Sequence, residues 1–237
     1  FDLVLPFSSN NTILCGLDAD TIISWDYLKT LDSYFTKQKI DCLIPGIKHQ
    51  NGANTDKERA IREYEDYLYS TAENLQNAGS PYGFVTMGSS MAFTPNCYMK
   101  AGGISRKRAT EDFYFLQEVV KTTSVKTIPE ILVHPSSRIS NRVYLGTGYR
   151  MWQAKKGYSL ADLKYSEESF IILKNWLKVG ENSYELTIEE LLDKTEKISS
   201  KLTIFLIKIG IHKIWSGLQS STSDQNRFKC QFHCWFD

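Results

Sequence analysis

The sequence lacks the features that mark disulfide-rich, membrane-spanning or nucleic-acid-binding proteins. Its 5 cysteines are odd in number and irregularly spaced, which argues against a disulfide framework and for a reducing compartment. The longest strongly apolar stretch, Leu202 to Ile207, is far too short to span a bilayer. The formal net charge is +1, so no excess of charge points to nucleic acid. These absences favour a cytoplasmic protein that is soluble or attached peripherally to the inner face of a membrane.

The composition is that of an ordinary globular protein. The 237 residues are 42% hydrophobic and 23% charged, enough to bury a sizeable core as one large domain or as one domain with an appendage. No internal repeat and no low-complexity stretch interrupts the chain.

Segments with the pattern of buried strands alternate with helical segments up to about residue 150. The expected strands are 13–17, 40–47, 84–87, 90–93 and 125–133. The expected helices are one capped by Ser24 with Trp25, Leu28, Leu31 and Phe35 on its apolar face, one from the capping box Thr55–Glu58 to about 77, a short one begun by Thr94-Pro95, and one that opens at Glu111.

Only helices are expected after about residue 150. One is capped by Ser166, one opens with the capping box Thr187–Glu190, and a long apolar one runs over 199–218. The pattern predicts an α/β domain over 1–150, with a mixed sheet flanked by helices, and a helical tail over 151–237.

Asp18-Ala19-Asp20 follows the first expected strand. Two carboxylates on alternate residues at a strand end can converge on one divalent cation, and oxygen-rich sites suit magnesium or manganese. Ligands of open α/β sheets also gather outside the carboxyl ends of the strands. The alternative is a polar loop with two solvated acids.

Glu111 and Asp112 stand at a helix start, a few residues after Gly102-Gly103. A carboxylate on the edge of a cleft could take the proton of an acceptor hydroxyl. The alternative is that the two acids only complement the helix dipole.

The segment 135–148 is expected to be a polar loop with Arg138, Arg142, Gly146 and Gly148. Arginine side chains grip phosphate oxygens, and paired glycines would let the loop close over a ligand. An exposed basic loop without such a role is the alternative.

The order LDADT, a helix with Tyr64-Glu65, GSSMAF, GGI, TEDFYFL and PSSRISNRVYLGTG resembles the family 2 glycosyltransferases, over residues 13 to 150. The resemblance implies a GT-A (Rossmann-like) fold and an inverting transfer of a sugar from a UDP- or GDP-sugar to a glycan or lipid-linked acceptor in surface polysaccharide or glycoconjugate synthesis. The Q-x-x-R-W motif of the cellulose-synthase branch of this family is absent, which argues against a processive polymerase. Only seventeen residues precede Asp18, so we expect the strands that hold the donor base to be missing from this chain.

The resemblance also implies roles for individual residues. Asp18 and Asp20 would engage Mn²⁺ or Mg²⁺ on the donor diphosphate, with Asp20 the direct ligand. Asp112 would be the catalytic base and Glu111 its supporting residue. The residues expected to contact donor or acceptor are Ser89, Ser90, Gly102, Gly103, Arg138 and Arg142. His134 is a candidate third metal ligand, with a structural role as the alternative.

Three alternatives stay open from the sequence. The chain could be a non-catalytic, truncated relative that scaffolds a glycan assembly complex, or a metal-dependent nucleotidyltransferase that releases pyrophosphate. The 199–218 helix, with Leu202, Phe205, Ile209 and Trp215 beside three lysines, could lie on an anionic membrane surface or pack on its own domain.

Overall fold

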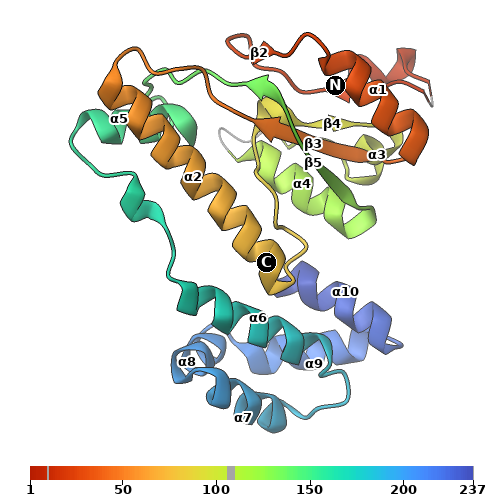
Figure 1. Ribbon diagram of the computed structural model, residues 1–237. Helices are drawn as coiled ribbons and strands as arrows, with labels where there is room; N and C mark the ends of the chain where they lie inside the picture. The colour runs from red at the N-terminus through yellow and green to blue at the C-terminus, as the bar shows by residue number, and fades with distance from the viewer. Residues whose placement is uncertain (10, 106–109, 237) are drawn as a thin grey trace. The chain divides into compact units, whose positions relative to one another are not determined.

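The computed structural model describes residues 1–9, 11–105 and 110–236, and Figure 1 shows its secondary structure. The chain forms two compact units. The first unit comprises 1–70 and 84–164, and the second comprises 71–83 and 165–237. The units divide the chain after Lys164, whereas the sequence places the change to a helical tail after about residue 150.

A mixed five-stranded sheet forms the centre of the first unit. Its strands lie in the order β1-β4-β3-β5-β2. Their bounds are Leu14–Cys15 for β1, Ile22–Ile23 for β2, Cys42–Ile47 for β3, Ala92–Phe93 for β4 and Val125–His134 for β5. β3 and β5 run parallel, and the other three pairings are antiparallel. The predicted class, a mixed α/β sheet flanked by helices with a helical carboxyl-terminal part, is confirmed.

The central strand β3 shows how this sequence tolerates a proline inside a sheet. All six residues of β3 are buried, as the near-continuous apolar run predicts. Pro45 has no N–H to donate, and the register with β5 shifts between Ile44 and Gly46. A Cβ on Gly46 would lie 2.9 Å from the carbonyl oxygen of Pro129, so the backbones approach too closely there for a side chain.

Among the described residues, five α-helices belong wholly or partly to the first unit. They are α1 (Tyr27–Gln38), α2 (Thr55–Ala78), α3 (Pro95–Lys100), α4 (Glu111–Thr122) and α5 (Gly146–Lys155). Short 3₁₀ turns occur at Leu5–Phe7, Gly88–Ser90 and Ala161–Leu163. As predicted, Thr94 caps α3 by accepting from the amide of Cys97.

The predicted start of α1 is wrong, and of its predicted apolar face Leu31 is buried whereas Trp25 and Leu28 are exposed. Ser24 does not cap the helix but bonds to β5, where its amide donates to the carbonyl of Leu132 at 2.9 Å. The helix therefore begins later, at Tyr27, and buries Tyr27 and Leu31. Trp25 and Leu28, expected in the core, are 93% and 69% exposed.

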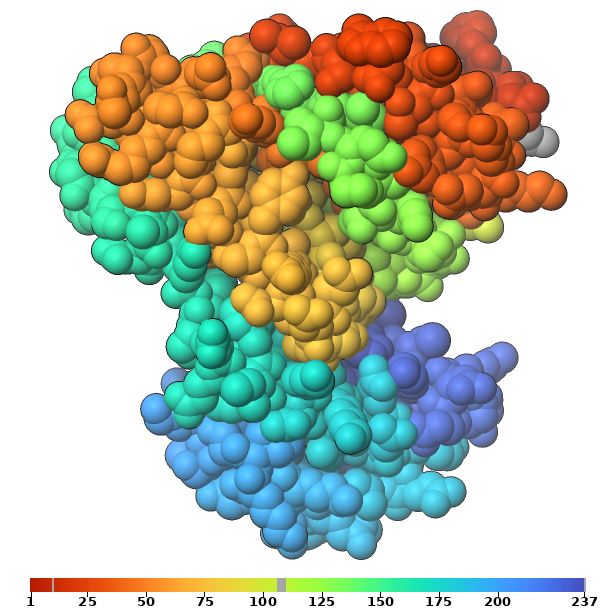
Figure 2. Space-filling view, viewed as in Figure 1, coloured from red at the N-terminus to blue at the C-terminus, as the bar shows by residue number. Residues whose placement is uncertain are grey.

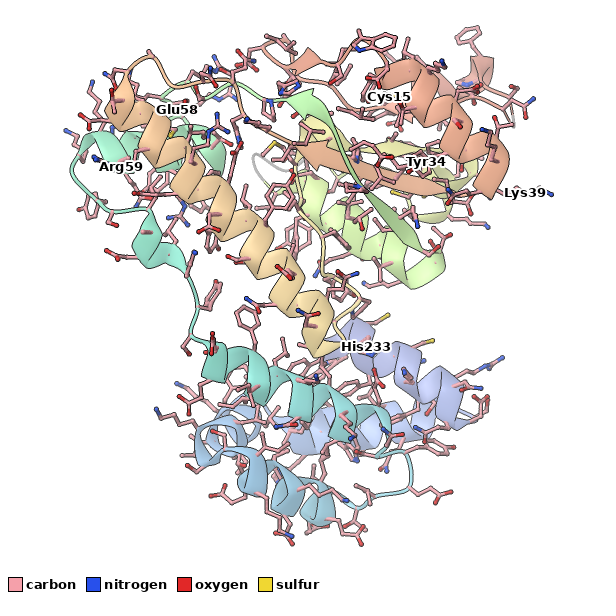
Figure 3. The ribbon with its side chains drawn as sticks, in the orientation of Figure 1. Cys15, Tyr34, Lys39, Glu58, Arg59 and His233 are labelled. Atoms are coloured by element: carbon pink, nitrogen blue, oxygen red, sulfur yellow. The ribbon has the colours of Figure 1, made fainter. Side chains whose placement is uncertain are left out.

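Two further predictions in this unit need correction. Asn54, rather than Thr55, accepts from the amide of Lys57, at 3.0 Å, so the cap of α2 lies one residue earlier. Glu58 is occupied elsewhere, since it accepts from the amide of Gly52 at 2.6 Å; Figure 3 shows Glu58 at the start of α2. Residues 84–87 do not form a strand, and 90–93 forms one only at Ala92–Phe93.

The second unit is a helical bundle. It contains α6 (Glu167–Glu181), α7 (Ile188–Ile198), α8 (Ser200–Lys208), α9 (Ile211–Ser221) and α10 (Gln225–Phe236). Their buried core is built around Trp176, Trp215, Phe228 and Phe232. The predicted cap at Ser166 and the predicted capping box at Thr187 and Glu190 are both confirmed.

The long helix predicted over 199–218 is wrong, because it breaks into α8 and α9 at Gly210. Gly210 has a φ of 83°, a left-handed conformation that ends a helix. Trp215 packs in the core of the bundle, whereas Phe205 and Ile209 are 50% and 40% exposed. Membrane contact through this segment stays a prediction. Among the helices of the described residues, none combines the length and apolarity needed to cross a membrane.

Candidate functional site

A cleft of about 450 Å³ in the first unit gathers the acids and arginines singled out from the sequence. They come from segments far apart along the chain. The side chains of interest in its lining are Asp18, Asp20, Ser89, Glu111, Asp112, Arg138, Arg142 and Thr147. Among the described residues, the lining of the cleft therefore includes four carboxylates and two guanidinium groups.

A tight turn carries the two acids that follow β1. The amide of Thr21 donates to the carbonyl of Asp18 at 3.0 Å, which closes the turn between β1 and β2. The side-chain amide of Gln50 donates to the carbonyl of Asp20 at 2.8 Å and to that of His134 at 2.9 Å. Gln50 thereby ties the turn to the carboxyl end of β5, which holds both acids at the edge of the sheet.

The acid turn is electrostatically crowded. Burial raises the pKa of Asp18, and the nearby carboxylates of Asp20 and Glu111 raise that pKa further. Arg138 and Arg142 act in the opposite direction. Like charges at this density favour binding of a cation.

The pair Glu111 and Asp112 forms the first turn of α4, as the sequence predicts. The preceding residue, Thr110, has a φ of 68°, which is costly for a β-branched side chain, about 1–3 kcal/mol. Burial raises the pKa of Asp112, although the amides of Phe113 and Gly88 donate to its carboxylate. A half-buried carboxylate with a raised pKa, lining a cleft, is suited to accept a proton.

Arg138 and Arg142 line the cleft from the segment after β5. The loop is shorter than predicted, because Gly146, Thr147 and Gly148 form the first turn of α5. The amide of Ser140 donates to the carbonyl of Gly148 at 3.0 Å, and a Cβ on Gly148 would lie 2.7 Å from that of Ser140. This close approach requires glycine at 148 and fastens the arginine segment to the helix.

Four predicted site residues, Ser90, Gly102, Gly103 and His134, do not line the cleft. Ser90 is buried, and its hydroxyl donates to the carbonyl of Met87 at 3.1 Å. Gly103 has a φ of 77°, and a Cβ there would meet the ring of Tyr98 instead of a ligand. His134 Nδ1 lies 2.9 Å from the carbonyl oxygen of Lys48. Within residues 1–9, 11–105 and 110–236, no three His, Cys, Asp or Glu side chains form a group able to hold a metal, and the metal role of His134 stays a prediction.

Ser89 lines this cleft and has an unsatisfied hydroxyl group. Its side chain is fully buried, and its hydroxyl has no hydrogen-bond partner within the described chain. A buried hydroxyl without a partner costs free energy, about 1–3 kcal/mol. A ligand oxygen in the cleft would satisfy it.

One feature of the cleft was missed from the sequence. His49 follows β3 and is 1% exposed. Its Nδ1 lies 2.9 Å from Oε1 of Glu65 and its Nε2 lies 3.0 Å from Oγ1 of Thr147. Glu65 was noticed only as half of the Tyr64-Glu65 pair, and nothing in the spacing of the three residues connects them.

A wider groove of about 700 Å³ lies on the other side of the arginine segment. Ile139 lines it, whereas Arg138 and Ser140 line the cleft. Its walls come from the start of α2 and from α5, which pack together through Ile61 and Met151 and adjoin in Figure 2. None of the predicted acids or arginines lines this groove, so the smaller cleft is the one that collects the chemistry.

No protein-family model and no curated protein matches the sequence. Among solved structures, the chain is similar to residues 1–349 of S. aureus TarS in complex with UDP-GlcNAc, at 10% identity and a TM-score of 0.45, over 98% of this chain and 68% of that one. A likeness at this TM-score does not establish a shared fold, so the site is interpreted from its own geometry.

Proposed function

We propose that this chain is the catalytic part of an inverting, metal-dependent glycosyltransferase of family 2 with a GT-A fold. It would transfer a sugar from a UDP- or GDP-sugar to a glycan or lipid-linked acceptor, in surface polysaccharide or glycoconjugate synthesis. The observation that carries the proposal is the convergence of Asp18, Asp20, Asp112, Arg138 and Arg142 on one cleft. These groups supply what such a transfer needs, namely cation ligands, phosphate ligands and a base.

The oxygen ligands in the cleft suit a hard divalent cation. Asp18 and Asp20 offer carboxylate oxygens, and the crowding that raises the pKa of Asp18 would be relieved by a bound cation. Since the described chain brings no third ligand to them, the remaining oxygens would come from the diphosphate and from water. Mn²⁺ or Mg²⁺ bound there would stabilise charge on the departing diphosphate.

The arginine segment is suited to hold the diphosphate. Arg138 pairs with Asp20 through Nε and keeps its terminal nitrogens for other acceptors. Arg142 makes no ion pair within the described chain. The orphan hydroxyl of Ser89 could donate to a ligand oxygen in the same cleft.

Asp112 is suited to be the base. In the proposed reaction the acceptor oxygen bonds to the anomeric carbon of the donor sugar, the bond from that carbon to the diphosphate breaks, and the acceptor proton passes to Asp112. Attack opposite the leaving group inverts the anomeric centre. Glu111 would support Asp112 by holding it in its raised-pKa environment.

Replacing Asp112 tests the proposal. We expect Asp112→Asn to lower the turnover of a nucleotide-sugar by about 10²- to 10⁴-fold while binding of UDP or GDP is kept. Asp193→Asn, an exposed change on α7, is the matched control. Retained turnover in Asp112→Asn would contradict the role of the base, and a wild-type chain without turnover would favour the scaffold. Release of pyrophosphate instead of a nucleoside diphosphate would indicate the nucleotidyltransferase.

A further inference from the structure

His49, Glu65 and Thr147 form a connected group that ends at the cleft. His49 is buried at the carboxyl end of β3, Glu65 lies on α2, and Thr147 lies in the first turn of α5. The two ring nitrogens of His49 lie 2.9 Å from Glu65 and 3.0 Å from Thr147. Of the three, Thr147 lines the cleft.

Glu65 is held in its ionised form. Burial raises its pKa, but hydrogen bonds from the ring and the backbone amide of His49 and from Arg62 outweigh burial, and the pKa lies below its ordinary value. Arg62 also donates to the carbonyl oxygen of His49 at 2.9 Å and to Glu58 at 2.8 Å. The carboxylate is therefore fixed in place and can only accept.

The ionised carboxylate decides the direction of the hydrogen bond with Nδ1 of His49. In a neutral imidazole one nitrogen donates and the other accepts. Nδ1 must donate to Glu65, so in the neutral ring Nε2 accepts from the hydroxyl of Thr147. The Thr147 oxygen then presents only lone pairs to the cleft. Such an oxygen repels the oxygens of a phosphate and suits a partner that carries a proton.

We infer that Thr147 is a positioning residue that accepts a hydrogen bond from a hydroxyl group of the transferred sugar or of the acceptor, with His49 and Glu65 holding it in that role. This inference rests on the proposed function, which does not say which residues contact the hydroxyl groups of the substrate. A sugar hydroxyl of the donor and a hydroxyl of the acceptor share this chemistry. In the proposed function the phosphates bind Arg138 and Arg142, which also line the cleft.

The test compares Thr147→Val, which keeps the shape and loses the hydroxyl, with Thr147→Ser, which keeps the hydroxyl. Thr30→Val, a half-buried change on α1 outside the cleft, is the matched control. Binding of UDP, GDP and their hexose conjugates is measured with Mn²⁺ by calorimetry. The KM for methyl glycosides as acceptors is measured alongside.

A donor contact predicts that Thr147→Val weakens the nucleotide-sugar by about 3- to 10-fold, leaves UDP and GDP unchanged, and is rescued by Thr147→Ser. An acceptor contact predicts the same change in the KM for the methyl glycoside alone. Equal losses for the nucleotide and its sugar, or no change in any constant, would overturn the inference.

A second readout needs no ligand. Nitrogen-15 spectra of the imidazoles, with the His49 signals assigned from His49→Gln, should show a proton on Nδ1 and an acceptor Nε2 that shifts in Thr147→Val. A proton on Nε2 would overturn the orientation of Thr147. A wild-type chain that shows the expected tautomer but binds no nucleotide-sugar would overturn the proposed function and the substrate contact, and leave the orientation standing.

Discussion

The guanidinium of Arg138 lies against the carboxylate of Asp20, with Nε 2.7 Å from Oδ2. Both side chains are solvent-accessible, at 67% and 39%, so the pair contributes little to stability. Its meaning is local: the acid proposed to hold a cation is neutralised, before any ligand binds, by the group proposed to hold the diphosphate.

Replacing Arg138 should therefore affect binding and not folding. We expect Arg138→Gln to weaken the binding of UDP or GDP by about 10- to 100-fold, because a charged hydrogen bond to phosphate is lost. Arg138→Lys should restore only part of this, since lysine lacks the planar fork. Calorimetry measures both, with the exposed Arg227→Gln on α10 as control. Equal affinity in Arg138→Gln and wild type would remove Arg138 from the site.

The pH dependence of turnover should report Asp112. A base must be ionised, so activity is present above its pKa in the folded chain and is lost as the pH falls through that value. Burial and the Glu111 carboxylate raise this pKa above 3.8. Glu111→Gln removes the negative neighbour and should move the acid limb of the kcat/KM profile to lower pH. If the acid limb does not move in Glu111→Gln, it reports the titration of a group other than Asp112.

The part of the site that could be predicted is the part held by local sequence. Asp18 and Asp20 follow a strand and Glu111 and Asp112 begin a helix, so short patterns place them at the same edge of a sheet. The contact between His49 and Thr147 joins residues 98 apart in sequence, and no local pattern contains it. The contact between Nδ1 of His134 and the carbonyl of Lys48 likewise joins residues 86 apart in sequence.

The fold was predictable to a similar degree. Most of the expected strands and helices are present, but 84–87 forms no strand and β2 was not predicted. Other boundaries failed where a tertiary contact competed with a local signal. Ser24 has the chemistry of a cap but bonds to the neighbouring strand β5. The long apolar run after Ser199 hid the break at Gly210, which only a left-handed backbone conformation reveals.

The corrected cap of α2 can be checked by two adjacent substitutions. Asn54→Ala should lower the free energy of unfolding by about 0.5–2 kcal/mol, because the amide of Lys57 loses its acceptor. Thr55→Ala should leave the free energy of unfolding close to that of wild type. Urea titrations of both variants decide the matter, and a larger loss in Thr55→Ala would restore the capping box that the sequence suggested.

The close packing between Gly180 and Phe232 in the second unit can be tested by substitution. A Cβ on Gly180 would lie 2.0 Å from the ring of the fully buried Phe232, so α6 and α10 touch at that point. Gly180→Ala should destabilise the protein by about 1–3 kcal/mol through overpacking. Gly217→Ala is the control, because a Cβ there meets nothing within 4 Å and alanine is the better helix former. Urea unfolding in which Gly180→Ala matched or exceeded Gly217→Ala in stability would contradict this packing.

The most direct measurement is the stability of this chain with UDP, GDP and their sugars, each with and without Mn²⁺, beside an Asp18→Ala/Asp20→Ala double variant. At a ligand concentration about a hundredfold above Kd, binding should add roughly 2.7 kcal/mol to the free energy of unfolding. Our prediction is a stabilisation that requires Mn²⁺ and disappears in the double variant. No stabilisation of the wild-type chain by any of these ligands, or the same stabilisation in both proteins, would contradict it.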